Sequence, residues 1–324
     1  MIKPFISICN PTYKRIDLLQ KLLDSIVSQG FKDYEVLIND NSPDDSVQTL
    51  VKQYTGSLLI QYEKNQPAVS AGANCVKVMQ RATGEWVKIM HDDDWFSSDD
   101  ALQIFADAAR DSGKNFIFCA STQVWLDSDK KQVDELTPEK KEMLDRSPFC
   151  LFYLNVIGHP SVAMQRRDPA IQYDTKFQWV LDIDFYMRYL VKHPGYHYIS
   201  QNLVNIGKCD SQESHKYYKN IRVELPEFFF LLSKYEPGLI LKDIYAFHLV
   251  WNMLKRYKIK KVSQIYEAGY EGPMPDRIEE IIAFQKYIPR LIVKQTPWSK
   301  KLMKACFQKI TRTSPDSTPQ KAFE

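Results

Sequence analysis

The sequence predicts an α/β protein with a mainly parallel sheet, flanked by helices and followed by a helical C-terminal extension. Over the first 120 residues, short runs rich in β-branched and aromatic residues alternate with segments whose apolar residues recur at helical spacing. Polar clusters follow three of the predicted strands, as in other ligand-binding sheets of this class. From Val223 on, only helical patterns recur. We therefore expect an α/β domain over residues 1–222 and a helical region over residues 223–324, with a flexible tail.

Strands and helices alternate regularly in the first part of the chain. Short β-rich runs predict strands at Phe5–Cys9, Tyr34–Ile38, Leu58–Tyr62, Trp86–Met90 and Phe116–Ala120. Helices are predicted between them at Arg15–Gln29, Ser46–Tyr54, Ser70–Arg81 and Ser98–Arg110. The first helix carries an apolar stripe of Leu18, Leu19, Leu22, Leu23 and Ile26. The polar residues 121–150 are interpreted as a long connection or lid, before a helix at Trp179–Lys192 and a strand at Tyr196–Ile206.

The composition is that of an ordinary globular protein and excludes several classes. Of the 324 residues, 44% are apolar and 26% are charged, so a sizeable core is expected. A net charge of +3 is too small to indicate nucleic acid as a partner. The six cysteines form no Cys-x-x-Cys pair, and their wide spacing indicates neither a zinc site nor a disulfide framework. Without a signal peptide or a stretch approaching roughly 20 apolar residues, the chain is expected in the cytoplasm.

Polar residues gather where three of the predicted strands end. The sequence NPTYKR follows the first strand, NDNSPDD follows the second, and HDDDW follows the fourth. The carboxyl ends of parallel strands lie at one edge of a sheet, where such proteins bind their ligands. We therefore expect the three clusters to meet in a single site.

The acidic triplet Asp92-Asp93-Asp94 is the strongest single feature of that edge. Adjacent carboxylates repel one another unless a cation neutralises them. Mg²⁺ and Mn²⁺ favour one or two carboxylates together with phosphate oxygens, so a divalent metal that holds a diphosphate would fit. The alternative is a solvated acidic loop that caps the next helix.

Four segments together resemble the family 2 glycosyltransferases, which have the GT-A fold. They are SICNPTYKR, NDNS, NQPAVSAGANCVKVMQRATGEWV and HDDDWF, in the order and spacing of that family. The resemblance is continuous over about residues 4–100 and returns in patches to about residue 215. It implies an inverting enzyme that transfers one sugar from a nucleotide-sugar, of the type that assembles bacterial surface polysaccharides such as O-antigen or capsule.

The resemblance also assigns residues to the donor nucleotide. Those implied are Pro11, Thr12 and Tyr13 around the base, Arg15 near the phosphates, Asp40 as an acceptor for the base, and Asn74 as a support of the pocket. A uridine base is favoured. Asp40 has an alternative role in an Asx turn, and Asn74 has one as a polar residue at a helix N-terminus.

For the metal, Mn²⁺ or Mg²⁺, the resemblance implies Asp94 as the main ligand. Asp92 and Asp93 would contact the ribose or metal-bound water. Many relatives have Asp-x-Asp-Asp-Trp, and in that register the first acid is replaced by His91. Two assignments therefore stay open: Asp92 and Asp94 share the metal, or Asp93 and Asp94 form the pair and His91 stands in for an acid.

The general base is expected in the segment WVLDIDFYMRYL, which resembles an acidic segment of the family. The first acid of that segment corresponds to Asp182. On a helix, Asp182 and Asp184 face different directions, so only one can point into a site, whereas Asp184 and Arg188 are spaced for an ion pair. Trp179 lies beside Asp182 and suits a sugar-binding cleft. The alternative is that both acids are surface charges.

The acceptor is expected to be a saccharide, by analogy a lipid-linked one. Residues implied near it are His159, Ser161, Arg166, Trp179 and Asp184, and a loop over residues 209–215 would close over the donor with Gln212, Ser214 or His215. One alternative is an inactive nucleotide-sugar-binding module. A second, less favoured, is a sugar-nucleotide pyrophosphorylase, whose Gly- and Arg-rich loop is missing after the first strand.

Basic residues dominate the segment 281–312. They are Lys286, Arg290, Lys294, Lys300, Lys301, Lys304, Lys309 and Arg312, and they alternate with aromatic and aliphatic residues. Such a stretch is typical of a contact with an anionic membrane surface, which would make the protein peripheral on the inner face of the cytoplasmic membrane. The alternative is a basic face packed on the acidic domain or on a partner chain.

Overall fold

The computed structural model describes residues 3–209, 217–235, 238–286, 288 and 296–312. The chain forms two compact units. The first comprises Met1–Pro148 and Val156–Gln212, and the second comprises Phe149–Asn155 and Glu213–Glu324. The boundary expected after residue 222 falls inside the second unit, which also takes up the short segment Phe149–Asn155.

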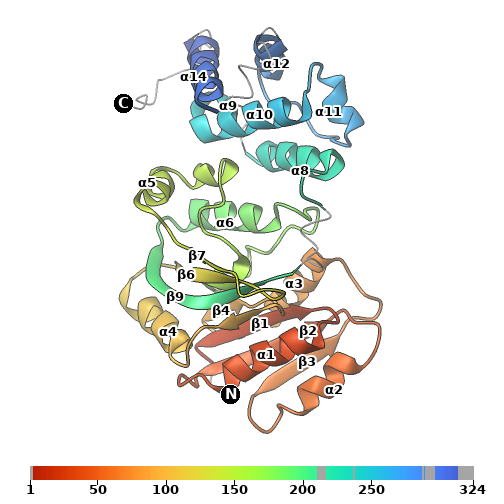
Figure 1. Cartoon of the computed structure of the whole chain (residues 1–324), viewed down its shortest axis with the longest axis vertical. Helices are drawn as coiled ribbons and strands as arrows, with labels where there is room; N and C mark the ends of the chain where they lie inside the picture. The colour runs from red at the N-terminus through yellow and green to blue at the C-terminus, as the bar shows by residue number, and fades with distance from the viewer. Residues whose placement is uncertain (1–2, 210–216, 236–237, 287, 289–295, 313–324) are drawn as a thin grey trace. The chain divides into compact units, whose positions relative to one another are not determined.

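The first unit is built on one nine-stranded sheet (Figure 1). In spatial order its strands are β3 (Ile60–Lys64), β2 (Tyr34–Asp40), β1 (Ile6–Thr12), β4 (Trp86–Ile89), β8 (Ala163–Arg166), β6 (Phe116–Trp125), β9 (His197–Lys208) and β5 (Asp94–Phe96), with β7 (Lys131–Asp134) paired to β6. The four strands from β3 to β4 are parallel, as predicted. The rest of the sheet is mixed, because β8, β5 and β7 run antiparallel to their neighbours.

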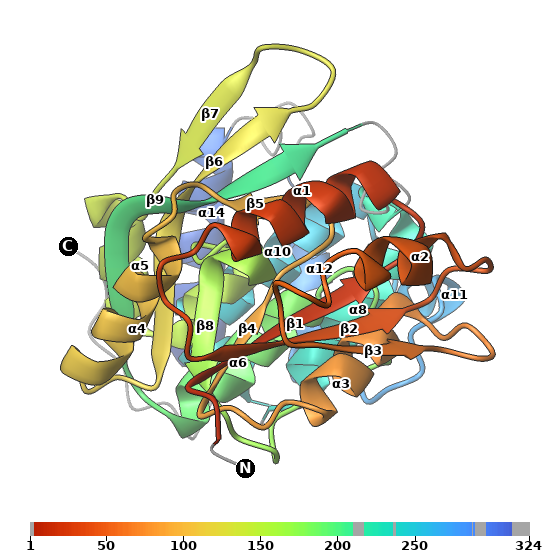
Figure 2. The same cartoon turned by 90° about the horizontal axis from the view of Figure 1, so that it is seen from below.

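Helices cover both faces of the sheet, so the α/β prediction is confirmed. They are α1 (Ile16–Val27), α2 (Ser46–Lys52), α3 (Ala71–Gln80), α4 (Ala101–Asp111), α5 (Pro138–Arg146) and α6 (Leu181–Lys192). Figure 2 shows α1 and α2 on one face of β1–β3 and α3 on the other. Four residues of the predicted stripe on α1 are buried, namely Leu19, Leu22, Leu23 and Ile26. This apolar stripe explains why α1 forms and which of its faces packs on the sheet.

The polar segment 121–150 is more ordered than the prediction of a connection or lid. Strand β6 continues to Trp125 because β9 pairs with it along one side and β7 takes the place of β8 on the other. The resulting hairpin projects from the sheet (Figure 2). Helix α5 then begins at Pro138, where the Thr137 side chain accepts a hydrogen bond from the backbone N–H of Lys140. The local signals for this order were the β-branched and aromatic residues in STQVW and the Thr-Pro start of α5.

The second unit is helical, as predicted. Its helices are α8 (Ile221–Ser233), α9 (Leu239–Lys242), α10 (Ile244–Tyr257), α11 (Ser263–Glu267), α12 (Ile278–Lys286) and α14 (Thr296–Arg312). Helix α10 is central, with Phe247 and Trp251 fully buried. Phe307 of α14 packs against Phe247, and Phe284 of α12 packs against Trp251. The apolar side of the basic C-terminal stretch is thus used to build the core of this unit.

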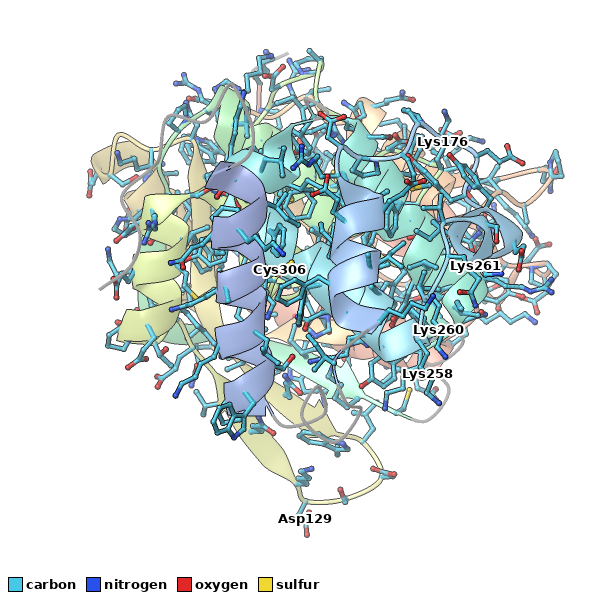
Figure 3. The ribbon with its side chains drawn as sticks, turned by 90° about the horizontal axis from the view of Figure 1, so that it is seen from above. Asp129, Lys176, Lys258, Lys260, Lys261 and Cys306 are labelled. Carbon is cyan, nitrogen blue, oxygen red and sulfur yellow. The ribbon has the colours of Figure 1, made fainter. Side chains whose placement is uncertain are left out.

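Helices α12 and α14 lie side by side, with Cys306 of α14 between them (Figure 3). The lysines Lys300, Lys301, Lys304 and Lys309 are exposed on the other side of α14. Arg290 and Lys294 lie outside the described residues. Across the part of the chain that the structure describes, no helix is both long and apolar enough to cross a membrane.

Candidate active site

The acidic triplet lies in a buried turn between β4 and β5, at the carboxyl edge of the sheet. Asp92, Asp93 and Asp94 are only 6%, 8% and 3% exposed. The backbone N–H of Gly207, on β9, donates to the carbonyl oxygen of Asp93 at 3.0 Å and to Oδ1 of Asp94 at 3.3 Å. A solvated acidic loop, the alternative weighed above, does not fit this burial. The turn is therefore held by a distant strand and not by its own sequence alone.

The end of β1 binds the first two acids. Oδ2 of Asp92 accepts hydrogen bonds from Thr12 Oγ1 at 2.9 Å and from the backbone N–H of Tyr13 at 3.0 Å. The Arg15 guanidinium lies 2.6 Å from Asp93 Oδ2 and 3.5 Å from Asp92 Oδ1. Burial and the neighbouring Asp93 nevertheless raise the pKa of Asp92 to about 6. Thus the predicted meeting of the first and third polar clusters is observed.

The side chain of Asp94 has different hydrogen-bond partners from the side chain of Asp92. Its carboxylate is hydrogen-bonded by Ser161, on the 3₁₀ helix η2 (Pro160–Val162), and by the Gly207 backbone N–H. The Ser161 hydroxyl also accepts from the backbone N–H of His91 at 2.9 Å. Burial, followed by repulsion from Asp93, raises the pKa of Asp94 well above its usual range. The turn is therefore short of positive charge even with its protein partners in place.

These residues fit a divalent metal that shares its coordination with a ligand. Within the described residues, no group of three or more His, Cys, Asp or Glu side chains converges to hold a metal unaided. Carboxylate oxygens are the hard donors that Mg²⁺ and Mn²⁺ prefer, and these ions are often held by one or two carboxylates plus phosphate. The raised pKa values of Asp92 and Asp94 show that a further cation would stabilise their ionised forms. The donor set thus suits a metal bound together with a diphosphate.

The second polar cluster lies at the same edge. Oδ1 of Asp40 accepts from the Ser42 backbone N–H at 2.7 Å, in the Asx turn weighed as an alternative, and Oδ2 accepts from Tyr62 at 2.8 Å. The amide of Asn74 donates to the Asn39 carbonyl at 3.1 Å. Hence Asp40 and Asn74 both order the strand ends. Pro11 is half-buried and Tyr13 is 47% exposed, so both can touch a ligand.

Two histidines lie behind the acidic turn. Nε2 of His91 is buried and has no hydrogen-bond partner among the described residues. His159 accepts a hydrogen bond at Nε2 from the Lys208 ammonium, 3.0 Å away. Burial, followed by the nearby Lys208, lowers the pKa of His159 to about 4, so its imidazole is neutral near pH 7. His159 therefore contacts the site through Lys208.

The two acids of α6 are separated as the helical spacing predicts. Asp184 is fully buried and pairs with Arg188, whose terminal nitrogen lies 2.6 Å from Oδ2. Asp182 is half-buried in the first turn, and Trp179 just before the helix is also half-buried. A Cβ on Gly72 of α3 would lie 3.3 Å from the Leu181 side chain, so the starts of α3 and α6 are in contact. The ion pair gives Asp184 a structural role.

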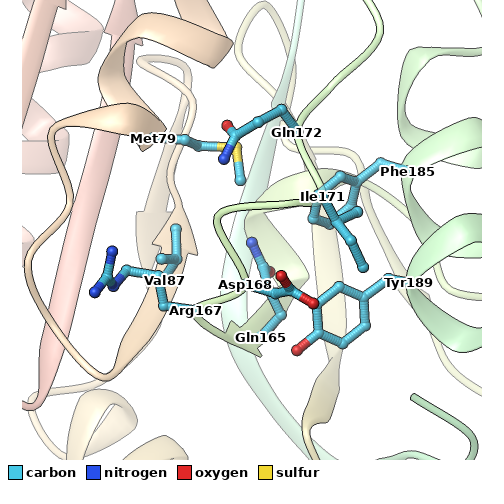
Figure 4. Close-up of a pocket in the computed structure, with 9 residues that line it drawn as sticks. All are labelled: Met79, Val87, Gln165, Arg167, Asp168, Ile171, Gln172, Phe185 and Tyr189. Atoms are coloured by element: carbon cyan, nitrogen blue, oxygen red, sulfur yellow. The ribbon is translucent and has the colours of Figure 1, made fainter. Parts of the chain in front are cut away.

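A small cavity of about 10 Å³ lies between β4, β8 and α6, away from the acidic turn (Figure 4). Its lining includes Val87, Gln165, Gln172 and Tyr189. None of the acids of the turn lines it. The cavity is far too small for a nucleotide-sugar, so it belongs to the packing of the unit.

Three residues that hold the site were missed in the sequence. Gly207 and Lys208 lie at the end of β9, and Lys88 lies inside β4. A glycine inside a strand run often marks a close approach of two backbones, and a lysine inside the apolar run WVKIM is unusual. The sequence therefore contained a signal for Gly207 and one for Lys88. The positions of Gln212, Ser214 and His215 lie outside the described residues.

Comparisons with known proteins identify a family and several relatives of this chain. The profile of a family described as glycosyl transferase family 2 matches residues 7–174. The abequosyltransferase RfbV of Salmonella typhimurium is 26% identical over 90% of this chain and 81% of its own length. A Campylobacter jejuni protein named as GalNAc(5)-diNAcBac-PP-undecaprenol β-1,3-glucosyltransferase is 34% identical over 28% of this chain and 30% of its own. Other curated relatives are matched over 63%, 58% and 59% of their lengths.

A solved structure shares the fold. S. aureus TarS (residues 1–349) in complex with UDP-GlcNAc superposes with a TM-score of 0.62, 14% sequence identity, and coverage of 95% of this chain and 91% of TarS. At that identity the similarity concerns the fold alone. It confirms the GT-A architecture predicted from the sequence.

We expect Gly207→Ala to damage the acidic turn. The added Cβ would lie 2.3 Å from the Asp93 carbonyl oxygen, so β9 and the turn would have to separate. Such overpacking costs about 1–3 kcal/mol of unfolding free energy, measured by denaturant titration. Gly56→Ala is the matched control, because a Cβ at Gly56 meets nothing within 4 Å. Equal stability of the two variants would contradict the close approach at Gly207.

Proposed function

The chain belongs to glycosyl transferase family 2 and is a transferase, and from that premise we propose that it moves one sugar from a nucleotide-sugar to a saccharide hydroxyl with inversion. The observation that carries the proposal is the buried acidic turn of Asp92, Asp93 and Asp94, held at the carboxyl edge of the sheet by Thr12 and Arg15. A sugar-nucleotide pyrophosphorylase does not agree with the family assignment.

We assign the donor nucleotide to the edge formed by β1 and β2. Pro11 and Tyr13 would contact the base, and Arg15 would reach the phosphates from the start of α1. Asp40 would accept from the base with a second lone pair, since each of its oxygens accepts one hydrogen bond from the protein and a carboxylate oxygen can accept two. We favour uridine, and the complex of TarS with UDP-GlcNAc supports that choice by analogy of fold.

We assign the metal site to Asp94, with Asp92 or Asp93 as the second acid. A divalent cation bound there, Mn²⁺ or Mg²⁺, would offset the negative charge of the leaving diphosphate. The residues around the acids would each orient or hold one of the carboxylates. Ser161 and Gly207 orient the Asp94 carboxylate, and Arg15 holds Asp93.

We propose Asp182 as the general base. Asp184 is fully buried in its pair with Arg188, whereas Asp182 is half-buried and can reach a ligand. Asp182 would take the proton from the acceptor hydroxyl as that oxygen attacks the anomeric carbon. Attack comes from the face opposite the nucleotide, so the configuration inverts. His159 and Trp179 would lie on the acceptor side.

The acceptor is proposed to be a lipid-linked saccharide of surface-polysaccharide assembly. The name of one relative supports the lipid linkage, since it includes an undecaprenol-diphosphate acceptor. We also propose that the protein acts in the cytoplasm, peripheral to the inner face of the membrane. The exposed lysines of α14 and Trp298, which is 55% exposed, would form that contact. Each cation near anionic lipid contributes about 1 kcal/mol.

The donor proposal predicts metal-dependent nucleotide binding. Calorimetry with UDP, GDP, dTDP and CDP, each with and without Mn²⁺, should show one nucleotide that binds more tightly with the metal. Asp94→Ala should abolish the metal-dependent part, because it removes the main carboxylate ligand. If the variant keeps the full metal effect, the assignment of Asp94 is wrong.

The base proposal predicts a separation of binding from turnover. Asp182→Asn should leave donor binding unchanged while transfer falls about 100- to 10,000-fold, the usual scale for loss of a general base. Asp184→Asn should instead lower stability, because it leaves Arg188 without its buried partner. Near-normal transfer by Asp182→Asn would rule Asp182 out. Donor binding with no transfer by the wild type on any acceptor would favour an inactive binding module.

The membrane proposal predicts charge-dependent vesicle binding. Wild type should sediment with phosphatidylglycerol vesicles and not with phosphatidylcholine vesicles, and the triple change Lys300→Glu, Lys301→Glu, Lys304→Glu should abolish sedimentation. The matched control reverses Lys258, Lys260 and Lys261, which are exposed elsewhere on the same unit (Figure 3). Equal loss in both triple variants would show that net charge matters and α14 does not.

A further inference from the structure

Lys208 places a second cation near the acidic turn, at the end of the strand that pairs with β5. It is the last residue of β9, one position after the Gly207 that binds the backbone of the turn. Lys208 is half-buried, and this burial lowers the pKa of its ammonium, while the nearby carboxylates of Asp94 and Asp93 act in the opposite direction. Arg15 approaches the same turn from the start of α1. The acids are thus flanked by two cations from distant parts of the sequence.

The position of Lys208 is set by His159. The ammonium donates to Nε2 of His159 at 3.0 Å, and His159 immediately precedes the helix η2. Because burial keeps the imidazole neutral, it accepts this hydrogen bond and does not repel the lysine. The same short helix carries Ser161, which binds Asp94. One element therefore orients both the carboxylate proposed for the metal and the cation beside it.

Arg15 and Lys208 differ in their contacts with the acids. Arg15 is in salt-bridge contact with Asp93 and Asp92. Among the described residues, no carboxylate lies within 4.0 Å of Lys208 Nζ, and its ammonium has three N–H groups of which His159 accepts one. A compact ammonium near the acids, but not paired with one of them, is suited to a phosphate oxygen.

We propose that Lys208, positioned by His159, binds the diphosphate of the nucleotide-sugar donor and offsets the charge that develops on it as the sugar leaves. This inference rests on the proposed function. In the transfer, the bond between the anomeric carbon and the diphosphate oxygen breaks, and its electron pair stays on that oxygen. The acceptor oxygen forms the new bond, and its proton goes to Asp182. Lys208 keeps its own proton and acts only by charge and hydrogen bonding.

The test compares a nucleoside diphosphate with the nucleoside of the same base. The probe is whichever of UDP, GDP, dTDP and CDP the wild type binds, measured by calorimetry in EDTA and in Mn²⁺. Lys208→Gln should weaken binding of the diphosphate in EDTA about tenfold or more and leave binding of the nucleoside unchanged. Lys208→Arg should restore most of that affinity, which a loss of fold would not allow.

A second measurement is the affinity of the protein for Mn²⁺ alone. Removing a cation beside the turn should strengthen binding of Mn²⁺ alone to Lys208→Gln, because like charges no longer repel. Single-turnover transfer should fall about 10- to 100-fold. Lys131→Gln is the matched control, since Lys131 is exposed on β7 of the same sheet. Equal diphosphate affinity of Lys208→Gln and wild type would overturn the inference, whereas failure of the wild type to bind any of the four nucleotides would overturn the proposed function instead.

Discussion

Burial of three consecutive carboxylates is the constraint on which the first unit depends. A turn that holds Asp92, Asp93 and Asp94 below 9% exposure is unstable unless other elements supply donors and cations. The end of β1 supplies Thr12, the start of α1 supplies Arg15, and the end of β9 supplies Gly207. These groups satisfy the acids in part, and the raised pKa values of Asp92 and Asp94 show the deficit that remains. The site is therefore built to receive positive charge, which a ligand-bound metal can provide.

A buried lysine, Lys88, supports the acidic turn indirectly. Lys88 in β4 is fully buried, donates to the Ser161 carbonyl at 2.6 Å, and lies 4.2 Å from the centre of the Phe105 ring. Burial lowers its pKa to about 8. The contact connects β4 to η2, and η2 in turn presents Ser161 to Asp94. Thus a lysine that would be anomalous in an ordinary core strand fixes the helix that positions a site carboxylate.

Signals from residues close together in the sequence were enough to predict most of the helices and strands and the residues that lie next to the acids. The stripe on α1 and the polar strand ends could be predicted because they depend on residues close in sequence. The roles of Gly207 and Lys208 could not, because the antiparallel pairing of β5 with β9 joins positions more than 100 residues apart. The extension of β6 to Trp125 was missed because it depends on pairing with β9, which follows about 80 residues later, as well as on the local hairpin with β7. The ion pair of Asp184 with Arg188 is local, and its spacing alone predicted it.

The charges of the site also constrain how it can work. Three carboxylates with Arg15 and Lys208 leave a formal charge of −1, from −3 and +2. A divalent cation held by these acids would change this to about +1, and a diphosphate diester of about −2 would return it to −1. In the proposed reaction the site would thus stay near neutrality at each stage, which would keep the electrostatic cost of burial small. Departure of the sugar would add one more negative charge to the diphosphate. Arg15 is already engaged by Asp93, whereas no carboxylate among the described residues lies within 4.0 Å of Lys208 Nζ, so of these two cations Lys208 is the less committed to the acids.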